Sequence, residues 1–535
     1  MRKLINDALI PRALTATFLI FMLLQLAAQA QYVRTERYQT EHDRRLQYAL
    51  DDWISYTSST RFTSMAAGTH YIYFGTKDGG ILRYHIYDNY WDYPFTVSNG
   101  LPSNHVENVA FDVKTSFLWA VTPNDVAIFN PTAKEWIRRS ETPGWPYQFP
   151  ETGTSADPNN PEKERFFDRD ALFELPGFFA NGSYSITGEW TLLDNFTFDE
   201  FPITGYLRDR FDRIWFLVDN FGIGVGLFFS RRIDFYRVGL PDFSPRALAY
   251  QGNDLWFGGI GRERRGTPAI ALWPYNDSGW QYFQARRISR LPRDDVNAIA
   301  TDGDSMWFAT EFGVSLYDAR EDDWRNWGLG QGIVSQTVLD IKVLGDFVYA
   351  ATEQGISRIN RFTGKGERVK DPRFTNLPFY RLAVQNDTLW AATFRGIFRY
   401  IDSIKDWELV EANTAVQDIN VTAVGVYENE VWFAAHGGVF WLDVNTGRWQ
   451  SFTQIAFEIN LPYTDIKVDD KNAWVATIDG LLRYNKEKQD WRLFTRQDGL
   501  LSNICYQLLL DGDYIWVANE GGFTQFLWNS DFRSD

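Results

Sequence analysis

A short apolar strand with an aromatic residue near its centre recurs along almost the whole chain. The copies "TLWAAT", "EVWFAA", "NAWVAT" and "YIWVAN" place their tryptophans 42 residues apart, at Trp390, Trp432, Trp474 and Trp516. A step of this length is typical of one β-propeller blade, which has four antiparallel strands. The ten markers are Tyr73, Trp119, Trp215, Trp256, Trp307, Tyr349, Trp390, Trp432, Trp474 and Trp516. The repeat therefore predicts an all-β propeller built from ten or eleven four-stranded blades.

One interval between markers is too long for a single blade. Trp119 and Trp215 lie 96 residues apart, and counting back 42 residues from Trp215 reaches Phe173. We interpret Phe173 as the marker of a degraded eleventh unit. Propeller rings usually have four to eight blades, so this number of units predicts either two rings or one unusually large ring, and the sequence leaves both arrangements open.

Turn residues separate the strands within each unit. In the last unit "DGLLSN" leads to "ICYQLLLD", "DGD" leads to "YIWVAN", and "EGG" leads to "FTQF". Asp-Gly and related pairs accept the positive φ that tight hairpins require. This unit ends without a fourth strand, whereas "DWISYT", with Trp53, stands alone near the N-terminus. We expect the N-terminal strand to complete the last blade, because that pairing removes an open sheet edge.

The first thirty residues have the pattern of a secretory signal peptide. Three basic residues precede the apolar run "LTATFLIFMLLQLAA", which ends at Ala28-Gln29-Ala30. We expect cleavage after Ala30 and export to the periplasm, the cell surface or the medium. A retained membrane anchor is the alternative, because the run is close to the shortest length that spans a bilayer. We assign 1–30 to the signal peptide, 31–51 to a polar N-terminal segment and 52–535 to the propeller array.

The charge and the residue types present argue against several functions. The chain has 69 Asp and Glu against 53 Lys and Arg, a formal charge of -16, whereas nucleic acids and anionic lipids bind basic surfaces. Neither partner is expected. The single cysteine, Cys505, lies in an apolar run, which indicates a buried, unreactive thiol. The five histidines have no metal-ligand spacing, and hydrolase and phosphate-binding motifs do not occur. We predict no metal and no cofactor, and the sequence identifies no catalytic residue.

The repeat motifs also resemble a known family. "DGLLSN", "IWVAN" and "DGLLRYN" resemble the two-component-regulator propeller repeat of bacterial extracytoplasmic sensors, and Gly480, Leu481, Arg483 and Tyr484 match the third strand of that repeat. The resemblance covers essentially the whole chain after the signal peptide and is specific for blade type, not for ligand. It implies a sensory or cell-surface module. Family members often carry a kinase and a DNA-binding module as well, and no segment of this sequence resembles either.

Two insertions interrupt the repeat. One covers about residues 139–161 and is rich in aromatic side chains; the other, "GGIGRERRGTPAIALW", carries three arginines. In a meandering blade both kinds of connection lie on the same face, and loops on a rigid scaffold often carry function. Aromatic side chains and arginines together suit an anionic sugar or a peptide. The alternative is loop drift without a function. The candidate ligand-binding residues are Arg262, Arg264, Arg265, Trp145 and Tyr147.

Some tryptophans fall outside the strand markers and could form a surface platform for a sugar. They are Trp145, Trp273, Trp327, Trp441 and Trp528. The sequence thus favours an exported, non-enzymatic binding module that recognises a glycan, a peptide or an envelope protein on its loop-rich face. A polysaccharide lyase or hydrolase is one alternative, since distant loops can bring carboxylates together. An accessory protein of envelope or secretion assembly is another.

Overall fold

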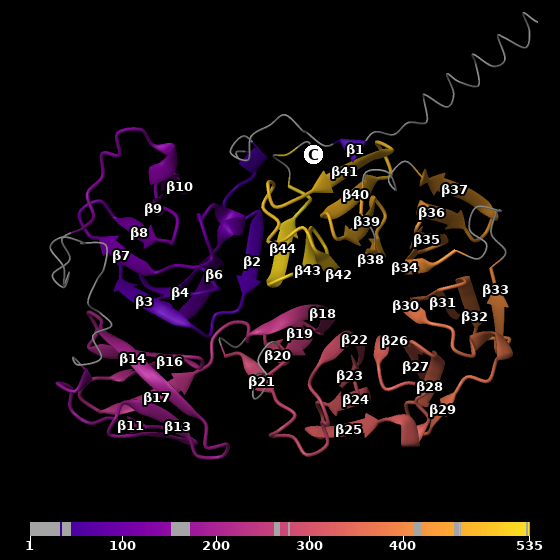
Figure 1. The fold of residues 1–535 in the computed structure, drawn as a ribbon, viewed down its shortest axis with the longest axis horizontal. Helices are drawn as coiled ribbons and strands as arrows, with labels where there is room; N and C mark the ends of the chain where they lie inside the picture. The colour runs from indigo at the N-terminus through magenta and orange to yellow at the C-terminus, as the bar shows by residue number, and fades with distance from the viewer. Residues whose placement is uncertain are drawn as a thin grey trace, which may run out of the picture.

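The computed structural model shows a chain made almost entirely of β-strands. It describes residues 33–34, 44–45, 47–150, 172–261, 268–275, 279–410, 419–453, 459–460, 462–530 and 533. The predicted signal peptide, residues 1–30, lies outside this part. Among the described residues, no helix combines the length and the apolar character needed to cross a bilayer. Figure 1 shows the strands gathered into two neighbouring groups, a closed ring and an open fan.

Seven antiparallel blades of four strands form the ring, and one of them gains a short parallel strand, β1 (Val33–Arg34), at its edge. Their strands are β18 (Phe243–Gln251), β19 (Asp254–Gly261), β20 (Ile270–Trp273), β21 (Gln281–Phe283); β22 (Val296–Asp302), β23 (Ser305–Thr310), β24 (Gly313–Asp318), β25 (Asp323–Trp327); β26 (Val338–Leu344), β27 (Phe347–Thr352), β28 (Gly355–Asn360), β29 (Gly366–Arg368); β30 (Phe379–Gln385), β31 (Thr388–Thr393), β32 (Gly396–Ile401), β33 (Asp406–Leu409); β34 (Val421–Tyr427), β35 (Glu430–Ala435), β36 (Gly438–Asp443), β37 (Arg448–Phe452); β38 (Tyr463–Val468), β39 (Asn472–Thr477), β40 (Leu481–Asn485), β41 (Asp490–Phe494); and β42 (Cys505–Asp511), β43 (Tyr514–Asn519), β44 (Gly522–Leu527) with β2 (Trp53–Thr57). Each first strand lies beside the next, and β42 returns to β18 (Figure 1). The ring is therefore a closed seven-bladed propeller.

Three further sheets form the fan. They are β3 (Phe62–Ala67), β4 (Tyr71–Thr76), β5 (Ile81–His85), β6 (Tyr90–Phe95); β7 (Asn108–Asp112), β8 (Phe117–Val121), β9 (Val126–Asn130), β10 (Glu135–Arg138); and β14 (Glu200–Arg208), β15 (Arg213–Val218), β16 (Gly222–Leu227), β17 (Arg232–Tyr236), which is extended by β11 (Phe179–Ala180), β12 (Tyr184–Ile186) and β13 (Thr191–Asp194). The sheet that begins with β3 lies in the middle, because β3 contacts both β7 and β14.

Short elements complete the described structure. β1 (Val33–Arg34) pairs with β41 in parallel, and four 3₁₀ turns are η1 (Val97–Asn99), η2 (Arg139–Glu141), η3 (Leu329–Gln331) and η4 (Pro372–Phe374).

The described residues form ten blades, the lower of the two predicted numbers. Phe173, which we interpreted as the marker of an eleventh unit, lies in a turn and is 56% exposed. The strands that follow it do not build a sheet of their own, because β13 pairs with the edge of β14 and β11 pairs with β17. The arrangement also differs from both predicted alternatives, since one ring closes and the remaining three blades stay open beside it.

The N-terminal strand closes the ring, as the sequence predicts. β2 pairs antiparallel with β44, and Trp53 lies opposite Phe526. Trp53 is 1% exposed and stacks on Phe526 with 3.7 Å between ring centroids. Tyr48 and Phe494 contact the same indole at 5.8 and 6.0 Å. The fan is therefore inserted in the chain between the closing strand β2 and the first ring strand β18.

The repeated turn "D/N-G-L" has the same geometry at both ends of the repeat array. The Asp498 carboxylate accepts a hydrogen bond from the Thr495 backbone N–H, and the Asn99 amide oxygen accepts one from Thr96, both at 2.7 Å. Gly499 follows with a φ of +137°, and a Cβ there would lie 2.5 Å from Cγ of Trp53. The motif recurs because the Asp or Asn side chain closes the turn by a hydrogen bond. The glycine that follows has no Cβ, which leaves room for the side chain of the next blade.

The segment before β2 is held to the ring by a buried ion pair. The Arg44 guanidinium donates to the Asp498 carboxylate at 3.0 Å from Nε and 2.6 Å from Nη2. Both side chains are buried. This contact fixes the chain just before the closing strand.

All ten strand markers are buried, which confirms their interpretation as core residues. They pack in clusters shared by neighbouring blades, such as the cluster of the first and last ring blades that contains Trp516. A marker at the interface between two twisted sheets fills the space that widens toward the rim. The repeat thus records one packing requirement that every blade has to meet.

Side chains also join the inner strands of the ring. Asp340 on β26 accepts a hydrogen bond from the backbone N–H of Leu382 on β30 at 2.7 Å. Asp465 makes the same contact to β42, and Gln507 makes it to β18, where the ring closes, both at 2.9 Å. These contacts run between blades, so they stabilise the closed ring.

Burial acts to raise the pKa of Asp340, but opposing interactions outweigh it. The charges of Lys342 and Arg381 and the backbone N–H groups of Leu382 and Ile341 hold the pKa of this carboxyl below its ordinary value. Asp340 is therefore kept ionised in the folded ring.

Candidate functional site

The structure describes two of the five residues that the sequence singles out. Arg262, Arg264 and Arg265 lie outside the described residues. Trp145 packs on Trp119 of β8 with 6.0 Å between centroids, and Tyr147 packs on Phe117 at 5.9 Å. Both side chains belong to the hydrophobic cluster on the outer face of β8 and β9, at one end of the fan. This packing explains the aromatic character of the insertion as a cover, and a ligand-binding role for Trp145 and Tyr147 stays a prediction.

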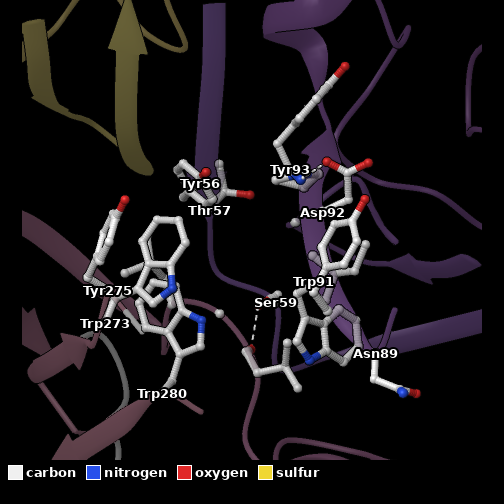
Figure 2. A pocket seen from close by; sticks show the side chains of 17 residues that line it. Tyr56, Thr57, Ser59, Asn89, Trp91, Asp92, Tyr93, Trp273, Tyr275 and Trp280 are labelled. Atoms are coloured by element: carbon white, nitrogen blue, oxygen red, sulfur yellow. Dashed lines mark hydrogen bonds between the residues drawn. The ribbon is translucent and has the colours of Figure 1, made fainter. Parts of the chain in front are cut away.

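A different site lies between the ring and the fan. It is a cavity of about 460 Å³, and Figure 2 shows aromatic side chains from both groups of blades facing it. We call it the aromatic cleft. Its aromatic residues are Tyr56, Tyr90, Trp91, Tyr93, Trp273, Tyr275 and Trp280.

The ring-side wall is a stack of aromatic rings. Trp273 ends β20 and Trp280 immediately precedes β21, and their indoles are nearly parallel with 5.3 Å between centroids. Tyr56 of the closing strand contacts Trp273 at 5.2 Å, and Phe257 supports Trp280 from behind at 5.5 Å. Tyr275 is 71% exposed. The wall is therefore rigid at the two indoles and open to solvent at its rim.

The fan-side wall comes from β6, which supplies Trp91, Asp92 and Tyr93 (Figure 2). The Asp92 carboxylate accepts a hydrogen bond from the Tyr71 hydroxyl at 3.0 Å and pairs with Arg83 at 3.1 Å. Among the described residues that line the cleft, Asp92 is the only acidic one. Glycoside hydrolysis commonly requires two carboxyl groups, and in this lining the one carboxylate is already paired with a cation.

The floor of the cleft is formed where the chain passes twice between the ring and the fan. Ser58 and Leu240, one on each passage, form a parallel bridge. The Ser59 backbone N–H donates to the Leu240 carbonyl at 3.1 Å, and the Ser59 hydroxyl donates to the Val238 carbonyl at 2.7 Å. The two passages are thus joined to each other directly beneath the aromatic walls (Figure 2).

The cleft presents hydrogen-bond donors that have no partner in the described structure. The indole N–H groups of Trp91, Trp273 and Trp280 form no hydrogen bond with any described residue. All three side chains are only half-buried, so their N–H groups can donate to water or to a ligand in the cavity. An apolar cavity with a few convergent polar groups is the usual form of a ligand site.

Part of this site was accessible to sequence reasoning and part was not. Trp273 is one of the five tryptophans outside the strand markers that we considered for a sugar platform. Trp91 and Trp280 were missed because they look like the strand tryptophans that fill cores elsewhere in the chain. No local signal shows that residues almost two hundred positions apart would face one another.

No protein-family model matches the chain, and no curated protein matches it. Solved structures to which it is similar include the extracellular domain of a hybrid two-component system from B. thetaiotaomicron, with 14% identity over 88% of this chain and 70% of that chain, at a TM-score of 0.43. PorZ, a surface component of the type-IX secretion system of Porphyromonas gingivalis, has 13% identity over 89% and 87%, at 0.35. Likeness of this degree carries no argument about function.

Proposed function

We propose that this protein is an exported, non-enzymatic binding module and that it holds a glycan in the aromatic cleft. The observation that supports this most strongly is that three half-buried tryptophans, Trp91, Trp273 and Trp280, line one cavity. Its volume, about 460 Å³, falls within the usual range of ligand pockets. A sugar has apolar C–H faces that pack on indole rings and hydroxyl groups that accept from N–H donors, so it matches both features.

Export rests on the signal-peptide pattern of residues 1–30. The scaffold also suits a binding role, because the closed ring fixes Trp273 and Trp280 while the fan fixes Trp91. Rigid aromatic side chains lose little conformational entropy when they bind, which favours affinity. Aromatic ring faces line the cleft, and these suit the apolar C–H faces of a sugar better than the backbone of a peptide strand.

The proposal is tested by isothermal titration calorimetry, in which residues 31–535 are titrated with a panel of neutral and acidic oligosaccharides and peptides. An oligosaccharide is expected to bind, and Trp280→Ala is expected to weaken it by tenfold or more, which corresponds to about 1.4 kcal/mol. Trp145→Ala is the matched control, because Trp145 is a half-buried tryptophan at the far end of the fan.

Two results would overturn the proposal. Peptides could bind while every oligosaccharide fails. Alternatively, Trp145→Ala could abolish binding while Trp280→Ala leaves it intact, which would move the site to the insertion at residues 139–161. Trp280→Phe keeps an aromatic ring at the wall and is expected to retain most of the affinity, which separates a lost contact from a lost fold.

A further inference from the structure

A second cavity adjoins the aromatic cleft. It has a volume of about 380 Å³ and lies between the fan and the loop that precedes β21. Trp91, Val238 and Trp280 line both cavities. The residues that distinguish the second cavity include Tyr184 and Arg237. A ligand large enough to fill the cleft can therefore extend past the shared indoles into this space.

Arg237 is the charged residue of this cavity and lies on the passage from the fan to the ring, directly after β17. Its guanidinium packs over the rings of Phe221 and Phe201, at 4.9 and 5.8 Å from their centroids. It forms no hydrogen bond and no ion pair with any described residue. Burial lowers the pKa of the Arg237 guanidinium, which shows that its surroundings disfavour the charge. A guanidinium has five N–H donors, and because Arg237 is only half-buried, these donors can be reached from the cavity.

Two carboxylates that interact with Arg237 through their charge are already paired with other arginines. Asp194 pairs with Arg287, and Asp199 pairs with Arg286, whose Nη1 is 3.1 Å from the Asp199 oxygen. The charge of Asp194 acts to raise the pKa of Arg237, and the charge of Arg237 acts to lower the pKa of Asp199. The cluster thus holds three guanidinium groups and two carboxylates, so one positive charge is left over on an otherwise acidic protein.

Neutral donors lie beside this charge. The Tyr184 hydroxyl forms no hydrogen bond with any described residue, and its ring contacts Phe221 edge to face at 5.2 Å. The Tyr282 hydroxyl donates to the Gly239 carbonyl at 2.7 Å, which fixes its position next to the passage. Among the described residues that line it, the cavity therefore offers the Arg237 guanidinium, the Tyr184 hydroxyl and apolar walls.

We propose that this second cavity binds the carboxylate of an acidic sugar, with Arg237 as the paired cation and Tyr184 as an additional donor. The choice of a sugar rests on the proposed function, whereas the anion site stands on Arg237 alone. A single guanidinium matches a single carboxylate, because its planar fork binds the two oxygens together. A phosphate dianion would require more positive charge than this cluster leaves over.

The test compares acidic oligosaccharides with their neutral counterparts. Oligosaccharides of galacturonate, glucuronate and mannuronate, and the same compounds after reduction of each carboxyl group to an alcohol, are titrated against residues 31–535. At least one acidic compound is expected to bind tenfold or more tightly than its reduced form, and the difference is expected to shrink as salt is added. Arg237→Met is expected to abolish the difference.

Arg232→Met is the matched control, because Arg232 is an exposed arginine at the start of β17, the strand that precedes Arg237, and carries the same charge. It is expected to leave the preference unchanged. Arg237→Lys keeps the charge but loses the fork, so an intermediate preference is expected, and this variant serves if Arg237→Met does not fold. The native protein alone also provides a test. If it shows no preference for acidic over reduced oligosaccharides, the anion site is refuted without any variant.

Several outcomes would overturn the anion site. Equal binding of acidic and reduced compounds would remove it and leave the proposed function standing. A preference that survives Arg237→Met would place the anion elsewhere. Stabilisation by inorganic sulfate or by acidic peptides, with no response to any acidic sugar, would show a different anion chemistry. Failure of every oligosaccharide, neutral or acidic, would defeat the proposed function together with the sugar assignment.

Discussion

Replacing Trp53 with alanine tests whether the N-terminal strand holds the ring closed. Removing a buried tryptophan costs about 3–5 kcal/mol. Trp53 is expected at the upper end, because it stacks on Phe526 and also contacts Tyr48 and Phe494, and aromatic pairs add about 0.5–1.5 kcal/mol beyond burial. If β2 separates from β44 without unfolding of the rest of the ring, the free energy required for this separation falls by the same amount.

The expected effect can be measured by amide hydrogen exchange. About 1.4 kcal/mol corresponds to a factor of ten, so protection of the β2 and β44 amides is expected to fall by about a hundredfold to a few thousandfold. Trp491→Ala is the matched control, because Trp491 is an equally buried tryptophan in the preceding blade, whose fourth strand follows its third in the chain. Its losses are expected in β38–β41. Equal loss of protection in every blade after Trp53→Ala would refute the reasoning, since the ring would then open only by unfolding as a whole.

Three further predictions concern stability and reactivity. Arg44→Met leaves the buried Asp498 carboxylate without its cation and is expected to lower the free energy of unfolding in urea by about 3–5 kcal/mol. Adding Asp498→Asn to Arg44→Met is expected to recover most of this loss, and no recovery would contradict the ion-pair account. Asp340 has a folded pKa below its unfolded value of about 3.9, so its contribution to the free energy of unfolding is present above that value and is lost as pH falls through the folded pKa. Asp340→Asn is expected to lower the free energy of unfolding at pH 7 by about 1.5–3 kcal/mol and to make stability less dependent on pH in acid. An unchanged pH dependence in acid would argue against this account. Burial raises the pKa of Cys505 to about 12, so thiol reagents at pH 8 are expected to label the protein only in denaturant, and rapid labelling of the folded protein would contradict its burial.

The blades could be predicted because their signals are local. A strand marker, a turn pair and a glycine recur within about 42 residues, and the orphan strand around Trp53 and the incomplete last unit complement each other in sequence. The same reasoning predicts an eleventh unit at Phe173, and this prediction is wrong because spacing alone does not define a blade without the turns that flank its strands. In the structure those residues extend an existing sheet.

The division into ring and fan could not be predicted, because the step is the same whether a blade closes a ring or lies outside it. Closure depends on β18 meeting β42, which is a contact between distant units. The aromatic cleft has the same origin. Trp91 and Trp280 carry the residue type that fills the core everywhere else, and their exposure to a cavity follows from how the fan lies against the ring.

Hydrogen exchange with and without a bound oligosaccharide tests the central claim most directly. The ligand is expected to protect amides of β6 around Trp91, the passage around Val238 and the segment from Trp280 into β21, and to leave the end of the fan around Trp145 unchanged. Protection confined to residues around Trp145, or to the ring away from β20 and β21, would contradict the account, because the ligand would then bind outside the aromatic cleft.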